Sequence, residues 1–220
     1  MMYYFLSVST KEDEIGCYHQ TTGLPEGYTS KWYDEPNSMT NLTDSSLPDF
    51  VPDLIWELKD DAILTDIISA GNITATGFLM SEKAKAIFER FNLIEHKFHK
   101  ASLIVKDQTL AYYYLQLVNM DFTEINFNKS SFCIGNVFRM KENDINILSS
   151  HDLIEKQKKL ELGHIIYAEK LSVNETFKAL DLFFFSIIHD DIFVSQNLLN
   201  ELIENNITGY DVTIQNIFEI

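Results

Sequence analysis

The sequence predicts an α+β fold, with mostly antiparallel sheets and a few packed helices. Aromatic and β-branched runs outnumber helical patterns, and the strands do not alternate regularly with helices as they do in a doubly wound fold. One strand–helix–strand pattern also occurs twice. With 220 residues, of which 45% are hydrophobic, the chain is long enough for one sizeable core, or for one core and a smaller lobe.

The first third of the chain is irregular and acidic. Residues 2–9 predict an opening strand, whereas residues 20–53 hold all four prolines and predict a long surface segment, docked by Trp32 and Tyr33. Residues 53–58 predict a short strand or the start of a helix, and residues 62–69 a short helix. We therefore expect residues 1–75 to form an acidic, Pro-rich lobe packed on a body of residues 76–220.

The body begins with a strand over 76–80 and a helix that Ser81 caps and that runs to about Asn92. Residues 181–189 and 192–194 predict a hairpin with Asp190 and Asp191 in its turn. The other expected elements are one or two strands over 93–105, strands over 110–118, 131–140 and 165–168, a helix over 151–162, a helix from Ser195 to about 205, and a last strand over 210–217.

The two serine-capped helices belong to similar units. Phe78–Ser81 corresponds to Ile192–Ser195, and the helices then run in register, 114 residues apart. Any capped helix between two strands has some of this pattern. If the repeat is structural, we expect the units to be pseudo-equivalent elements around one sheet.

The charge of the chain restricts its partners. It has 33 acidic and 17 basic residues, which gives a formal charge of −16, and residues 1–80 alone carry −10. Such a chain repels nucleic acids and anionic membranes and attracts a basic partner, although acidity also serves solubility. The start of the chain does not resemble a signal peptide, and Cys17 and Cys133 form no disulfide framework, so we expect a cytoplasmic protein.

Each candidate for chemistry has a simpler structural explanation. His96 and His99 have a spacing that suits a metal on a helix, but they fall in a predicted strand or loop. His189 with Asp190 and Asp191 could hold a cation or act as a base, but a turn also favours aspartate. No nucleotide-binding or nucleophile-elbow motif is present. We expect no catalytic residues, no cofactor and no metal.

Three stretches carry a resemblance to a known family: GFLMSEKAKAIFERFNLIEHKF, YYYLQLVNMD and DIFVSQNLLNELIENNITGYDV. Over about residues 76–220 the chain resembles a bacterial family of immunity proteins from polymorphic toxin systems, long catalogued as a domain of unknown function. The resemblance implies a protein without catalytic activity or cofactor, which binds a cognate toxin domain and blocks it.

Residues of the partner surface are predicted from this sequence alone. Trp32, Tyr33, Asp34 and Glu35 combine aromatic anchors with charge, as interface hot spots often do, and Asp190 and Asp191 lie at the expected turn. A small-ligand or regulatory binding module is the first alternative, and a deep apolar pocket with converging polar groups would favour it. An enzyme without a recognised motif is the second.

Overall fold

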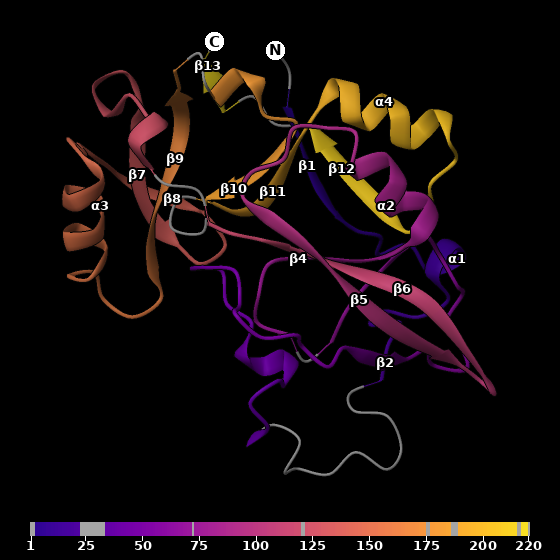
Figure 1. Cartoon of the computed structure of the whole chain (residues 1–220). Coiled ribbons are helices and arrows are strands. Elements are labelled where there is room, and N and C mark those ends of the chain that lie inside the picture. The colour runs from indigo at the N-terminus through magenta and orange to yellow at the C-terminus, as the bar shows by residue number, and fades with distance from the viewer. Residues whose placement is uncertain are drawn as a thin grey trace.

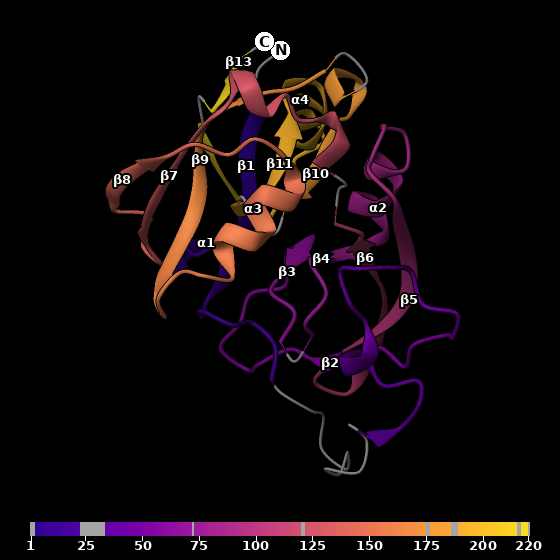
Figure 2. The same cartoon turned by 90° about the vertical axis from the view of Figure 1, so that its left-hand side faces the viewer.

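The computed structural model describes residues 3–22, 34–71, 73–119, 122–174, 177–185, 189–214 and 217–219. Within these ranges the chain forms three sheets, most of whose strand pairs are antiparallel, and four short α-helices (Figures 1 and 2). The predicted α+β class is confirmed.

The first sheet joins the two ends of the chain. Strand β1 (Tyr3–Val8) lies between β11 (His189–Ser195) and β12 (Tyr210–Ile214), and β10 (Leu182–Phe185) is at the edge beside β11. All three pairings are antiparallel. Strand β1 is therefore an inner strand of a sheet whose other strands all come from the last 40 residues.

The second sheet has the order β2-β5-β6-β4-β3. Its strands are β2 (Ile55–Glu57), β3 (Ile67–Ile68), β4 (Gly77–Ser81), β5 (His96–Val105) and β6 (Gln108–Leu117). The β5–β6 hairpin is long, and it runs to the lower right of the view (Figure 1). Within this sheet β2 pairs with β5 in parallel, and the other described pairings are antiparallel.

The third sheet has the order β13-β9-β7-β8 and lies on the opposite side of the molecule from the β5–β6 hairpin (Figure 1). Its strands are β7 (Ser131–Asn136), β8 (Lys141–Ile145), β9 (His164–Ser172) and β13 (Phe218–Glu219). Helix α3 (Ser150–Gln157) packs next to β9, and Ser149 caps it through the backbone N–H of Asp152.

The two predicted repeat units are present. Helix α2 (Glu82–Phe88) follows β4, and helix α4 (Gln196–Glu204) follows β11. The hydroxyls of Ser81 and Ser195 accept hydrogen bonds from Ala84 N and Leu198 N, both at 3.2 Å. The helices lie side by side (Figure 1), but the units belong to two different sheets, not to one as expected.

Two aspartates complete the equivalence of the units. The Ser81 hydroxyl donates to Asp66 at 2.7 Å, and the Ser195 hydroxyl donates to Asp181 at 2.6 Å. The second carboxylate oxygen of each aspartate accepts from the other unit, since Asp66 binds Thr208 N and Asp181 binds Asn92 N. We name Asp66 and Asp181 the paired aspartates; each connects the start of one helix to the segment after the other.

Two hydrophobic cores hold the sheets together. The larger core spans all three sheets and includes a cluster of aromatic rings from Tyr3, Phe177, Phe183, Phe193 and Phe218. The smaller core lies on the second sheet, where Met39 and Leu42 pack with fully buried Trp56. These contacts attach the irregular segment before β2 to the sheet.

Several expectations about the first third and the hairpin need correction. The sheets do not follow a boundary at residue 75, because β1 joins the first sheet and β2 and β3 join the second. Residues 62–69 contain strand β3 instead of a helix, since Ile67 and Ile68 pair with Met80 and Leu79. Asp190 and Asp191 lie within β11 instead of in a turn, because the β10–β11 pairing already includes His189.

A buried polar chain also attaches the irregular segment. Nε2 of His99 lies 2.8 Å from Oε1 of Gln116, whose amide nitrogen donates to the carbonyls of Thr43 and Ser46. Burial lowers the pKa of the His99 imidazole, and the nearby Lys97 lowers it further, against the effect of the Gln116 hydrogen bond. The neutral ring is thus the form that the folded chain favours.

His99 is therefore expected to make the chain less stable in acid. Its folded pKa lies below the unfolded value of about 6.5, so the unfolded chain binds the proton first and stability falls as pH drops below that value. Compared with His99→Gln, the wild type should lose up to about 1.4 kcal/mol of its free energy of unfolding per pH unit between pH 6 and pH 5. Urea unfolding at both pH values measures this, with His151→Gln as an exposed control. Parallel pH profiles of the wild type and His99→Gln would contradict the prediction.

Candidate partner-binding site

Two acidic segments of the N-terminal third lie against each other. Helix α1 (Glu12–Ile15) is held to the 59–64 loop by a hydrogen bond of 2.8 Å from Ile63 N to Ile15 O. Gly16, at φ +78°, lies so close to this loop that a Cβ there would be 2.2 Å from the Asp61 carbonyl oxygen. Only glycine allows this approach, which brings two acidic pairs together.

Exposed carboxylates and apolar side chains mix on this surface. Tyr18, Ile63 and Leu64 are 59%, 47% and 44% exposed. Large exposed apolar groups among charges are typical of protein interfaces. We define the acidic face as these three residues together with the exposed Glu12, Asp13, Asp60 and Asp61.

Lys11 and Glu14, on either side of Glu12 and Asp13, have structural roles. Lys11 is paired with Asp211 on β12. The Glu14 carboxylate accepts hydrogen bonds from the Ser9 hydroxyl at 2.8 Å and from Gly209 N at 2.7 Å. Glu14 thus attaches α1 to the first sheet, whereas Glu12 and Asp13 remain exposed to solvent.

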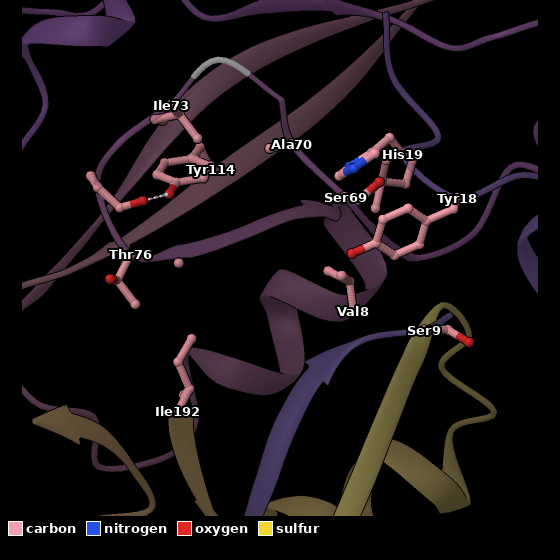
Figure 3. A pocket seen from close by; sticks show the side chains of 13 residues that line it. Val8, Ser9, Tyr18, His19, Ser69, Ala70, Ile73, Thr76, Tyr114 and Ile192 are labelled. Atoms are coloured by element: carbon pink, nitrogen blue, oxygen red, sulfur yellow. Dashed lines mark hydrogen bonds between the residues drawn. The ribbon is translucent and has the colours of Figure 1, made fainter. Parts of the chain in front are cut away.

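A cleft of about 340 Å³ opens next to the acidic face, between the first and second sheets (Figure 3). Tyr18 and His19 form one of its sides, and Ile73, Tyr114 and Ile192 line it further along. The Tyr114 hydroxyl donates to the Ala75 carbonyl, and burial raises the pKa of this phenol strongly. Tyr114 therefore stays neutral and acts as a hydrogen-bond donor.

The structure describes the backbone of four of the six predicted partner residues. Trp32 and Tyr33 lie outside the described residues. Asp34 and Glu35 are exposed, and the Glu35 carbonyl accepts from Ser38 N and Asn41 Nδ2. Asp190 and Asp191 are in β11, where their side chains lie outside the described part, and the next residue, Ile192, lines the cleft.

Thr22, the last described residue before Trp32 and Tyr33, lies near the cleft. Its N–H donates to the Glu57 carbonyl at 2.8 Å. Its carbonyl oxygen would be 3.8 Å from a Cβ on Gly71, next to Ala70 in the cleft wall. The acidic face itself was not predicted, although Glu12-Asp13-Glu14 and Asp60-Asp61 were its visible signal.

The two closely spaced histidines do not converge. His99 is buried and bound to Gln116, whereas the ring Nδ1 of His96 lies 2.7 Å from the Ile94 carbonyl oxygen. They are three residues apart in a strand, so they point to opposite faces. Among the described residues, no three His, Cys, Asp or Glu side chains gather as a metal site would require.

Both cysteines are poor thiolate candidates. Burial raises the pKa of the Cys17 thiol, and a hydrogen bond to Asp61 and the charge of this carboxylate raise it further. Burial likewise raises the pKa of Cys133, which lies inside the third sheet. Both groups favour the neutral thiol, which is the weaker nucleophile.

The chain matched no known protein family, and no curated protein was found to have a similar sequence. The resemblance to immunity proteins therefore remains a prediction. Within the described residues, no helix has the length and apolar character needed to cross a bilayer.

Proposed function

We propose that this protein is a non-catalytic immunity protein, which binds a cognate bacterial toxin domain and neutralises it. The observation that carries this proposal is the acidic face, where two segments in contact carry four exposed carboxylates and three exposed apolar side chains. Apolar anchors contribute affinity, and the carboxylates speed and orient the encounter with a basic partner.

The uneven distribution of charge supports the same face. Residues 131–172, which form β7, β8, α3 and β9, contain six Lys or Arg and six Asp or Glu and are neutral. The whole formal charge of −16 therefore belongs to the rest of the chain. A basic toxin would be attracted away from the third sheet, towards the side that carries the acidic face.

The proposal also states where the protein acts and which class of molecule it binds. The protein acts in the cytoplasm, where the toxin would do its damage, and its partner is a protein domain instead of a nucleic acid or a membrane. A nuclease-like toxin fits, because proteins that bind nucleic acid carry basic surfaces.

Co-expression tests the function directly. The chain should restore growth to cells that produce the toxin domain encoded beside its gene, and the two proteins should co-purify. Continued cell death despite normal amounts of the chain would refute the proposal.

Trp32 and Tyr33 provide a further prediction at the predicted partner segment. Replacing both by Ala should weaken toxin binding by about tenfold or more, because aromatic hot spots typically contribute more than 1 kcal/mol each. Calorimetric titration of the toxin measures the change. A matched control is Phe138→Ala, which removes an aromatic side chain, 83% exposed, from the neutral third-sheet region. Equal affinities of the double variant and the wild type would rule out this part of the interface.

A small-ligand binding module is the second candidate. It is favoured by a separate, largely apolar cavity that is lined by Leu93, Ile94 and Leu180 among others.

A further inference from the structure

The first and second sheets share one strand order, which continues further in the second sheet. Strands β3, β4, β6 and β5 of the second sheet correspond to β10, β11, β1 and β12 of the first. In both sheets the strands before and after the helix pair antiparallel with the strand between them. The second sheet then adds β2 beside β5, whereas among the described residues β12 is the last strand of the first sheet. We name the outer side of β12 the open edge.

The open edge has the composition of a strand that pairs on both sides. Val212 and Ile214 are 37% and 66% exposed, and Thr213 between them is also exposed. The charged side chain of this strand, Asp211, is already paired with Lys11. Native proteins commonly protect an open edge with charges, and β8 at the edge of the third sheet has three charged residues among its five. The β12 edge lacks this protection.

We propose that β12 pairs antiparallel with β12 of a second copy of this chain, centred on Val212, so that two first sheets become one continuous sheet. Val212 then lies opposite Val212 of the second copy. Tyr210 lies opposite Ile214, and Asp211 lies opposite Thr213. Pairs of an aromatic and a β-branched residue stabilise neighbouring strands, and no like charges are opposed in this register. The strand is therefore complementary to itself.

Charge decides both which edge pairs and in which direction. The same pairing of β8 about its middle residue would place Glu142 opposite Asp144, which are like charges. Helix α1 lies at the Tyr210 end of β12, because Glu14 accepts from Gly209 N at 2.7 Å. Parallel pairing would bring two acidic faces together, whereas antiparallel pairing places them at opposite ends of strands about 14 Å long. The dimer goes beyond the proposed toxin binding and does not depend on it.

Sedimentation velocity of the full chain tests the dimer. We expect a weak monomer–dimer equilibrium, because one strand pair buries less than the roughly 1,200–2,000 Å² of a stable interface. Raising the salt from about 0.05 M to about 0.5 M should strengthen dimerisation, since two copies of charge −16 repel each other. A chain that stays monomeric up to about 1 mM, or a dimer that salt weakens, would overturn the proposal.

A lysine on each of two edges provides a matched comparison. Val212→Lys should weaken dimerisation about tenfold, because it opposes two charges at the centre of the pairing. Asn143→Lys, on the β8 edge, adds the same charge and should leave dimerisation unchanged. Equal effects of the two variants would overturn the proposal. A monomeric wild type whose protection against the toxin is lost in Val212→Lys would assign the open edge to the toxin instead, and it would also overturn the dimer.

Cysteine variants test the direction and the register. Oxidised glutathione should cross-link two copies of Val212→Cys, because directly opposed residues have Cβ atoms about 4.5–5.5 Å apart, close enough for a disulfide. Ile214→Cys should not cross-link, since it would lie about 14 Å along the strand from Ile214→Cys of the second copy. The wild type, with Cys17 and Cys133, gives the background. Cross-linking of both variants would indicate parallel pairing, and either that result or cross-linking of neither would overturn the proposal.

Discussion

Replacing Asp181 by Ala should lower the free energy of unfolding by about 3 kcal/mol. The Asp181 carboxylate accepts from the Ser195 hydroxyl at 2.6 Å and from Asn92 N at 3.1 Å. Hydrogen bonds to a charged group contribute roughly 1.5–3 kcal/mol each, and this pair is only partly buried. The loss also frees Ser195, which caps α4 through Leu198 N.

Urea unfolding of Asp181→Ala and Asp66→Ala measures this effect. The two variants should lose similar amounts, because Asp66 makes equivalent bonds to Ser81 and Thr208. Asp144→Asn is the control, since its carboxylate is 80% exposed and its ion pair with Lys141 should contribute less than about 1 kcal/mol. A loss at Asp181 as small as that of the control would show that the paired aspartates do not join the units.

The repeat shows which parts of the fold the sequence could predict. The serine caps and the helices after them are local signals, visible within a few residues, and both were predicted correctly. The paired aspartates were missed because their partners are distant along the chain, 89 residues from Asn92 to Asp181 and 142 from Asp66 to Thr208. Nothing near Asp66 or Asp181 in the sequence identifies such a partner.

Strand pairing with distant residues also explains why two elements were predicted incorrectly. Ile67 and Ile68 fit the end of a short helical pattern, but they pair with β4, and the Thr208 carbonyl accepts from Ile67 N at 2.9 Å. Asp190 and Asp191 have the composition of a turn, yet strand β11 includes them. Local propensity is a weak guide where a strand is completed by distant residues.

The candidate site could not be predicted either, because it too depends on contacts between residues that are distant in the sequence. The sequence predicted an acidic N-terminal third, but it did not show that α1, which carries Glu12 and Asp13, lies against the loop that carries Asp60 and Asp61. That contact depends on Gly16, whose close approach to the Asp61 carbonyl appears only in the folded chain. Trp32 and Tyr33 were chosen from composition, and their part in binding stays a prediction.

Neutralising the acidic face should slow toxin association by about tenfold or more at low salt. The variant is Glu12→Gln, Asp13→Asn, Asp60→Asn and Asp61→Asn, which changes the formal charge from −16 to −12. Electrostatic steering raises association rates from about 10⁵–10⁶ to as much as 10⁸–10⁹ M⁻¹s⁻¹, so removing the local field should cost a large part of that gain. Glu14 is left intact because it holds α1 to the first sheet.

A second variant distinguishes the effect of where the charges lie from the effect of the net charge. Glu142→Gln, Asp144→Asn, Glu155→Gln and Glu161→Gln remove the same four charges from residues 131–172, outside the acidic face. Stopped-flow rates at about 0.01 M and about 1 M salt, where the screening length falls from about 30 Å to about 3 Å, should separate the two variants only at low salt. Equal slowing by both would mean that only net charge matters, and a wild-type rate indifferent to salt would refute steering by this face. Slowing of the first variant alone would assign the toxin encounter to the acidic face.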